Sequence, residues 1–487
     1  MFIIKITGDV GYMKKFSRII CLILAAAIAL LSAGCRSNSS TTSELSDGGY
    51  DGNGGGITVD VTGGKNQSGG NGSASSGKGG NSSKNNSGTS HSKDNISKIP
   101  SNLKGTTVEF YNWNPASEYP QMSQLIKEFE RATDVKIKWT VASYENYCVE
   151  IAARVAANNS PDIIRFKFMN VAEMELVQPV TNSGFDFSGS EWDHQLMDYY
   201  TVNGKTYAVN MTNTLINSPF LLTYNKDLIA MNDYEDPYTL WKKGKWTWSK
   251  FIEMCEDYHN STKNAAYIIY TYDSYCRING YQGILSYSNG KFGNNLKETR
   301  FIKLLAQANE YKSSGMVKTW DYDGFCSGKY PFMENMAIHL RTANPYFANL
   351  KAEGKLGVVP YPTIEGNSTE YASIGELEAY GFPKGAKNIA AAPYFLEYIL
   401  DADNYDEKSY FFNEQALECY KYVMGLKNRV VHTRYPDGKF NRSDLDPIHG
   451  GVDGKSESQI TTYVEKVDDL LSTHINNFNN RLSRLSQ

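Results

Sequence analysis

Strands and helices alternate from shortly after residue 100, and this alternation limits the fold more than any other feature of the 487-residue chain. Period-two patterning and apolar residues at helical spacing mark the elements. The predicted strands are 107–111, 135–141 and 161–164, and the predicted helices between them are 122–133 and 144–157. Strand–helix–strand order requires right-handed crossovers and favours a mainly parallel sheet. We therefore expect an α/β fold.

Aromatic and amide side chains follow two of these strands. Trp113 and Asn114 come after the first strand, and Phe166, Phe168 and Asn170 follow the third. In open parallel sheets, ligands lie beyond the carboxyl ends of the strands. Flat aromatic faces with neighbouring hydrogen-bonding groups suit sugar or peptide ligands. We expect these five side chains near any cleft.

The N-terminal segment has the layout of an export signal. Basic residues at Lys14, Lys15 and Arg18 precede an apolar run over 19–31, and Ser32-Ala33-Gly34-Cys35 follows. A cysteine directly after two small residues resembles the bacterial lipobox, in which the cysteine becomes the lipidated first residue. We expect a lipoprotein signal peptide over 1–34 and lipidation at Cys35. An uncleaved anchor helix and a secreted protein without lipid are the alternatives.

A linker separates this signal from the folded region. Residues 35–103 are rich in Gly, Ser and Asn, a composition that cannot bury enough apolar surface to offset its ordering entropy. We expect this stretch to be a disordered tether, with the folded region starting near residue 104.

Composition excludes several classes of protein. Lys and Arg total 49 against 53 Asp and Glu, so the chain has no positive excess with which to bind nucleic acid. A mean hydropathy of -0.46 excludes a polytopic membrane protein. No two cysteines have the spacing of a metal site or a redox motif. We expect isolated thiols, no metal and no cofactor.

A series of short motifs resembles one family in its order along the chain. The motifs are 110–113 Phe-Tyr-Asn-Trp, 160–164 Ser-Pro-Asp-Ile-Ile, 203–207 Asn-Gly-Lys-Thr-Tyr, 222–228 Leu-Thr-Tyr-Asn-Lys-Asp-Leu, 246–248 Trp-Thr-Trp, 357–362 Gly-Val-Val-Pro-Tyr-Pro and 382–388 Phe-Pro-Lys-Gly-Ala-Lys-Asn. Residues 104–400 resemble the extracellular solute-binding proteins of family 1, the receptors of ABC importers. Two of these motifs also predict local structure. Asn203-Gly204 predicts a type I′ turn, and Thr247 predicts a helix N-cap.

The resemblance implies a two-lobed periplasmic-binding-protein-like (type II) fold with a ligand cleft between the lobes. The implied connections between lobes lie near 210–216 and 375–382. The implied first lobe is 104–214 plus 329–380, and the second is 215–328 plus 381–487.

The resemblance also implies ligand-binding positions. Asn217 and Ser218 would lie at the hinge, Arg341 after a strand over 337–340, and Glu376 in the second connection. The candidate ligand-binding residues are Trp113, Asn114, Phe168, Asn170, Asn217, Ser218, Arg341 and Glu376.

The function implied is capture of a sugar, in particular an oligosaccharide, and its delivery to the membrane subunits of an ABC permease. We expect a monomer held by its lipid at the extracellular face of the cell membrane, with no enzymatic activity. Arg341 and Lys167 stand where common sugar-binding members have other residues. A peptide or an anionic solute is therefore the alternative ligand.

Three rival interpretations remain open. A membrane-anchored glycan hydrolase would need a carboxylate pair, but neither a Gly-x-Ser-x-Gly nor a His-Glu-x-x-His motif occurs. Calcium could bind the acidic loops at 321–324 and 444–446, although neither continues to the Glu of an EF-hand. A receptor that feeds a membrane sensor would have the same fold as an importer subunit.

Overall fold

The computed structural model describes residues 91–166, 170–269, 274–366, 369–376, 378–431 and 445–485. The predicted signal peptide, the lipidation site Cys35 and most of the predicted linker lie outside the described residues. The last part of that linker differs from the prediction. Residues 91–97 form helix α2 (His91–Ser97), because Ile96 and Ile99 are buried and Ser92 Oγ donates to Asp401 Oδ2 at 2.6 Å.

The first sheet has five strands in the order β2-β1-β3-β15-β4. β1 pairs in parallel with β2 and with β3, as the crossover argument predicts, and β15 is antiparallel to β3 and β4. The strands are β1 (Thr107–Asn112), β2 (Lys136–Val141), β3 (Ile163–Arg165), β4 (Val177–Gln178) and β15 (Tyr380–Pro383).

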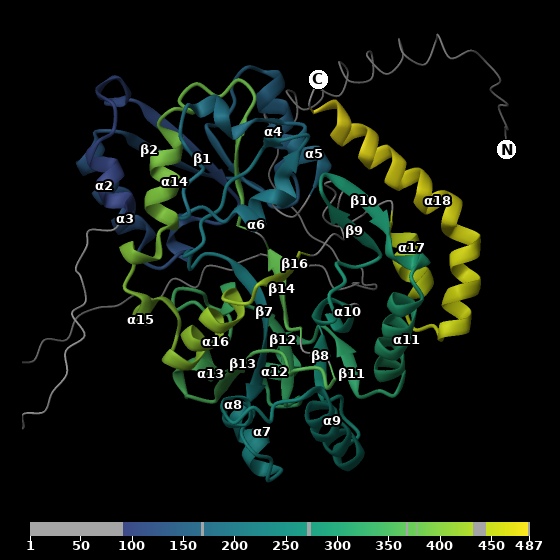
Figure 1. Ribbon diagram of the computed structural model, residues 1–487. Coiled ribbons are helices and arrows are strands. Elements are labelled where there is room, and N and C mark those ends of the chain that lie inside the picture. Colours follow the sequence, from purple (N-terminus) through teal and green to yellow (C-terminus); the bar gives the residue numbers. More distant parts are fainter. Residues whose placement is uncertain are drawn as a thin grey trace, which may run out of the picture. The chain divides into compact units, whose positions relative to one another are not determined.

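Helices cover both faces of this sheet (Figure 1). Alternation along β1 sends Phe110 to one face, 6.1 Å from Phe395 between ring centroids, and Tyr111 to the other, where it stacks on Tyr147 at 5.6 Å. The helices concerned are α3 (Met122–Thr133), α4 (Tyr147–Ala156) and α14 (Ala392–Leu400). The elements predicted between residues 107 and 164 are all present.

Glu109 on β1 makes this sheet sensitive to acid. Burial alone would raise the pKa of its carboxyl group, but hydrogen bonds from Arg154, Thr140 and Lys138 outweigh burial and lower the pKa to about 2. Arg154 contributes two of these bonds, at 2.6 and 3.0 Å. A carboxyl group whose pKa is depressed by folding stabilises the protein above its ordinary pKa of 4.5 and loses that contribution as the pH falls toward 2.

We therefore expect the melting temperature of the wild-type protein to fall between pH 4.5 and 2 more steeply than that of Glu109→Gln. Thermal unfolding followed by circular dichroism across this range measures the difference. Parallel curves for the two proteins would show that Glu109 does not contribute.

The second sheet contains seven strands, with the path β11-β8-β12-β7-β14-β16 and β13 beside β7. They are β7 (Ser218–Asn225), β8 (Tyr267–Ile269), β11 (Val317–Thr319), β12 (Phe332–Met336), β13 (Leu356–Val359), β14 (Tyr371–Glu376) and β16 (Asn428–Val431). All eight residues of β7 are buried. The strand therefore needs partners along both edges: β12 on one side, and β13 and β14 on the other.

This pairing differs from the predicted lobe boundaries. Residues 329–380 were grouped with the first lobe, but β12, β13 and β14 belong to the second sheet. β15 and α14, which were grouped with the second lobe, lie with the first sheet. The predicted strand over 337–340 is also a 3-10 helix, η6 (Ala337–Leu340), because β12 ends at Met336.

Helices also flank the second sheet (Figure 1). α9 packs on it through Phe251, which lies 5.1 Å from Phe332 and 5.0 Å from Tyr267 between ring centroids. Thr247 caps α9 as predicted, since its side chain accepts from Lys250 N. The helices here are α7 (Lys226–Met231), α8 (Pro237–Lys242), α9 (Trp248–Thr262), α10 (Ser274–Ile278), α11 (Thr299–Ser313), α12 (Tyr322–Cys326), α13 (Ala348–Ala352), α15 (Glu407–Tyr410), α16 (Glu414–Met424) and α17 (Asp446–Val452).

Several short elements lie outside the two large sheets. Asn203 and Gly204 join β5 to β6 with φ of 49° and 75°, the left-handed conformation predicted for this turn. The short elements are α5 (Val171–Met174), α6 (His194–Met197), η4 (Asp198–Tyr200), β5 (Thr201–Val202), β6 (Lys205–Thr206), β9 (Leu285–Ser288) and β10 (Lys291–Asn294).

The last helix, α18 (Glu457–Arg484), runs alongside elements of both sheets (Figure 1). A capping box formed by Ser456 and Gln459 starts it. Asn479 exchanges hydrogen bonds with the backbone of Phe292 at 2.8 and 3.1 Å. Arg481 forms a bidentate pair with Glu175 at 2.9 and 2.7 Å. The helix therefore ties the β9–β10 hairpin to α5.

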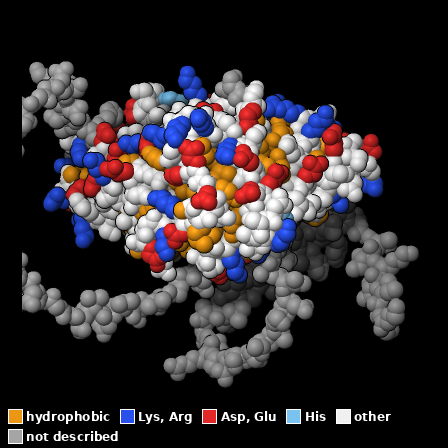
Figure 2. Space-filling model, turned by 90° about the horizontal axis from the view of Figure 1, so that it is seen from below, with side chains coloured by type: hydrophobic (Ala, Val, Ile, Leu, Met, Phe, Trp, Pro, Cys, Tyr) orange, Lys and Arg blue, Asp and Glu red, His pale blue; other side chains and the backbone are white. Residues whose placement is uncertain are grey.

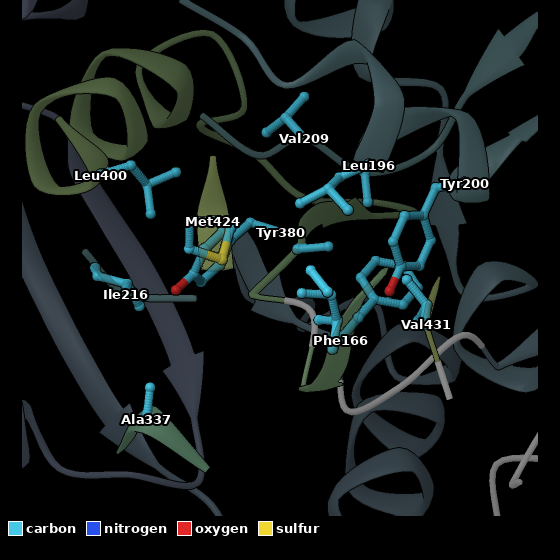
Figure 3. Close-up of a cluster of buried hydrophobic side chains, with 14 of the residues drawn as sticks. Phe166, Leu196, Tyr200, Val209, Ile216, Ala337, Tyr380, Leu400, Met424 and Val431 are labelled. Atoms are coloured by element: carbon cyan, nitrogen blue, oxygen red, sulfur yellow. The ribbon is translucent and has the colours of Figure 1, made fainter. Parts of the chain in front are cut away.

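A continuous hydrophobic core joins the two sheets. Figure 3 shows Phe166, which directly follows β3, grouped with Tyr200 and with Val431 of the second sheet, and Tyr380 of the first sheet beside Met424. Phe166 lies 4.8 Å from Tyr200 between ring centroids. The chain crosses between sheets after Val209, between β14 and β15, and again between α14 and α16. The first two crossings match the predicted connections.

The surface shows no segregation of charge on the face drawn in Figure 2, where Lys and Arg side chains are interspersed with Asp and Glu. This agrees with the net charge of -4. Within the described ranges, no helix is long and apolar enough to cross a membrane.

Candidate ligand-binding site

The carboxyl ends of β1 and β3 bring the first candidate residues together. The parallel register aligns Phe110 with Ile163 and Tyr111 with Ile164, so the residues that follow leave the sheet at one edge. Trp113 and Asn114 are each 9% exposed there. This placement agrees with the sequence-based argument for both residues.

Arg165, at the end of β3, contacts several of the side chains at this edge of the sheet. Its guanidinium group is fully buried and donates to Asn114 Oδ1 at 2.7 Å and to Tyr119 Oη at 3.1 Å. The guanidinium carbon lies 4.1 Å from the centroid of the Trp113 ring. The Arg165 guanidinium group therefore covers one face of the Trp113 ring, the aromatic face predicted to contact a ligand.

Glu378 neutralises Arg165. The carboxylate comes from the connection between β14 and β15, and its Oε1 lies 2.6 Å from Arg165 Nη2 with both side chains fully buried. The sequence analysis did not select either residue as a site residue. The available signal was a charge inside an apolar stretch: Arg165 in Ile-Ile-Arg-Phe and Glu378 in Leu-Glu-Ala-Tyr.

Arg341 approaches the same region from the second sheet, after η6. It is 1% exposed, and its guanidinium carbon lies 5.1 Å from the ring centroid of Tyr119 and 5.7 Å from that of Tyr410. Nη2 donates to the carbonyl of Ile216. Burial opposes its charge, but Tyr410 and Glu378 outweigh burial and raise the pKa of Arg341 above its ordinary value. The group is a buried cation.

Arg341 keeps donors that the described residues do not use. Neither Nε nor Nη1 has a hydrogen-bond partner of good geometry in the part of the chain that the structure describes. Buried polar groups in native proteins are nearly always hydrogen-bonded, so an exception needs an explanation. A bound ligand with acceptor atoms would supply the missing partners.

The two residues predicted to lie at the hinge, Asn217 and Ser218, are buried. Asn210 Nδ2 donates to Asn217 Oδ1 at 3.0 Å, and Asn217 Nδ2 has no partner within the described residues. Ser218 Oγ accepts from the backbone N–H of Ile338 at 3.0 Å. Asn217 therefore adds another free donor, whereas Ser218 holds η6 in place.

Of the remaining candidate residues, only Asn170 has a side chain that the structure describes. Asn170 caps α5, where its Oδ1 accepts from Glu173 N at 2.7 Å, which is a structural role. Glu376 ends β14 opposite Ser218 in the register, and its side chain is outside the described part. Phe168 and Lys167 also lie outside the described residues.

In the acidic loop at 321–324, the carboxylate of Asp321 already bonds to neighbouring protein groups. Asp321 accepts from Gly324 N at 3.0 Å and from Tyr330 Oη at 2.7 Å, and it pairs with Lys318 at 2.5 Å. No group of three or more metal-ligating side chains occurs among the described residues. Cys255, Cys326 and Cys419 are free thiols, as predicted.

A family model for bacterial extracellular solute-binding proteins matches residues 124–410, which is more than half of the chain. The chain belongs to this family. Its members are ABC transport receptors that bind solutes without catalysing a reaction, which confirms the family and the non-enzymatic function predicted from sequence. No curated protein matches the sequence.

Solved structures confirm the fold at low sequence identity. The sugar-binding protein MalE from Xanthomonas citri matches with a TM-score of 0.57 and 14% identity over 76% of this chain and 98% of that one. The GacH receptor of Streptomyces glaucescens, solved unliganded and with acarbose, gives 0.55 and 17% over 75% and 98%. Lmo0181 from Listeria monocytogenes, solved with cycloalternan, gives 0.53 and 15% over 75% and 99%. The chain thus has the periplasmic-binding-protein-like α/β fold.

Proposed function

We propose that this ABC solute-binding protein captures an oligosaccharide between two lobes, one around each sheet, and delivers it to its permease. The main observation in support is the buried cluster at the junction of the sheets, where Arg341 and Asn217 have N–H groups without a hydrogen-bond partner among the described residues. Sugar hydroxyl and ring oxygens are acceptors for such groups. Similar folds solved with acarbose and cycloalternan add support at the level of fold.

The proposed mechanism is closure of the lobes by bending of the connections after Val209 and between β14 and β15. The first lobe would supply Trp113 and Asn114, and the second Arg341. Phe168, Asn170, Ser218 and Glu376 stay proposed contacts. We also propose that Cys35 carries a lipid that holds a monomeric receptor at the extracellular face of the membrane, through the linker.

An anionic solute is the second candidate ligand, and Arg341 is the observation that favours it. A buried guanidinium group with free N–H donors can bind a carboxylate or phosphate through two parallel hydrogen bonds. Thermal-shift screening of neutral oligosaccharides, acidic oligosaccharides and peptides separates these ligand classes. Stabilisation by acidic ligands alone would favour the second candidate.

Trp113→Ala tests whether the aromatic platform contacts the ligand. We expect ligand binding to weaken by at least about 1 kcal/mol, the energy scale of one lost aromatic contact. Calorimetry with the best ligand from the screen measures the change. Trp241→Ala is the control, because Trp241 packs on Tyr422 beside the second sheet, 5.1 Å between ring centroids, and is not a candidate ligand contact. Equal affinities for both variants would remove Trp113 from the site.

A further inference from the structure

Helix α18 (Glu457–Arg484) reaches from the side of the second sheet to the side of the first. A helix of 28 residues is about 42 Å long. It packs against α17 and α11 and ends beside α5, along the outer edge of the molecule in Figure 1. The family match ends at residue 410, so this helix lies outside it.

Most of α18 is attached to elements on the side of the second sheet. Asp468 accepts from Asn294 Nδ2 at 3.2 Å and pairs with Lys297 at 3.0 Å. Phe478 lies 5.5 Å from Phe292 between ring centroids. These partners belong to β10 and the turn after it, which lie in the chain between β8 and β11 of the second sheet. Polar and apolar contacts together make this a firm attachment.

The last turn of α18 and the residue after it contact the side of the first sheet. Arg481 makes its bidentate pair with Glu175, which directly follows α5. Tyr207 Oη, from the segment before the first crossing, donates to the carbonyl of Leu485 at 2.6 Å. The side chains of Arg481 and Glu175 are 22% and 38% exposed. This attachment is therefore partly solvated, and the ion pair can break at a low cost in free energy.

Another ion pair joins the two sides close to the first crossing. Asp193 pairs with Arg429 of β16, and the backbone N–H of Asp193 donates to the carbonyl of Asn210 at 2.9 Å. When two bodies rotate about a hinge, atoms near the hinge move least and atoms at the edge move most. Figure 1 shows α18 at the edge, away from β7 and β14, which lead into the first two crossings. A rotation of the lobes would therefore strain the contact at the end of α18 more than the pair at Asp193.

We propose that α18 is a strap, fixed to the side of the second sheet, whose last turn restrains the separation of the two lobes by holding α5. The inference rests on the lobe movement proposed above and adds a restraint outside the buried cluster around Arg341. Asn170, one of the candidate ligand contacts, caps the start of α5, and Glu175 follows its end. The strap thus acts on an element that carries a candidate ligand contact.

Pulsed double electron–electron resonance on the ligand-free protein tests the proposal. Spin labels on unnatural amino acids replace Val149 and Met231, which are exposed on α4 and α7. In Arg481→Met we expect the population at longer distances to be about fivefold larger than in wild type, the effect of one partly exposed ion pair. An unchanged distribution would overturn the strap. It would leave the proposed capture of a solute intact, because no ligand is added here.

Lys312→Met is the matched control. Lys312 on α11 pairs with Asp453 at 2.9 and 2.7 Å, and these side chains are 30% and 34% exposed. Both residues lie near the start of α18, so losing this pair should leave the distances unchanged. Glu175→Arg should act like Arg481→Met, and the reversed pair Glu175→Arg/Arg481→Glu should restore the wild-type distribution. An equal effect of Lys312→Met, or no recovery with the reversed pair, would contradict the proposal.

Discussion

Replacing Glu378 with alanine is expected to destabilise the protein by about 3–5 kcal/mol, the cost of leaving a buried charge without its partner. Glu378 and Arg165 are both fully buried, 2.6 Å apart, and Arg165 also holds Asn114 and Tyr119. Loss of the carboxylate leaves a buried guanidinium whose desolvation is no longer compensated. Chemical denaturation of the ligand-free protein measures the change in the free energy of unfolding.

The double variant Arg165→Met/Glu378→Leu separates charge compensation from simple loss of volume. The double variant removes both charges and keeps the apolar volume. If the attraction between the two charges mainly offsets the cost of burying them, this variant should regain much of the stability that Glu378→Ala loses. A Glu378→Ala protein as stable as wild type would show that this pair is solvated, and that the cluster at the junction of the sheets is open.

Arg341→Met is expected to differ from Glu378→Ala: it should lose ligand binding without losing stability. Hydrogen bonds to charged groups contribute about 1.5–3 kcal/mol each, so losing one weakens binding at least about tenfold. Stability should stay equal or rise, because a buried cation with unused donors is costly to the folded protein. Calorimetry and chemical denaturation give the two quantities.

Arg277→Met is the matched control for this prediction. Arg277 is also fully buried, but its guanidinium group donates to Glu334 at 3.0 Å, Ser274 at 3.0 Å and Ser373 at 2.9 Å. Its replacement leaves Glu334 uncompensated, so it should cost about 3–5 kcal/mol of stability. A large loss of stability in Arg341→Met with unchanged affinity would identify Arg341 as a structural residue instead.

Local sequence signals predicted the first half of the fold well. β1, α3, β2, α4 and β3 lie where periodicity placed them, because each pattern reflects burial of one face. The positive φ angles at Asn203 and Gly204 and the cap at Thr247 follow from properties of single residues. α2 was missed, because two buried isoleucines in a polar stretch give no periodic signal.

Non-local pairing was harder to predict. The assignment of β12–β14 to the second sheet depends on which edges of β7 are open, and the apolar pattern of a buried strand does not identify its partner. The site shows the same limit. The end of a strand placed Trp113 and Asn114 beside each other at the sheet edge, and their role as ligand contacts stays a prediction. The pairing of Arg165 with Glu378 joins residues far apart in the chain, which no local pattern reveals.

Lobe closure around an unmodified solute is the central claim, and the distance between fluorophores on the two lobes tests it most directly. Val149 on α4 is 70% exposed and Met231 on α7 is 77% exposed, so both positions accept labels on unnatural amino acids without disturbing the core. With the ligand from the thermal-shift screen, energy transfer should rise on addition and return when the intact ligand is dialysed away. Unchanged transfer at saturating ligand would contradict the account.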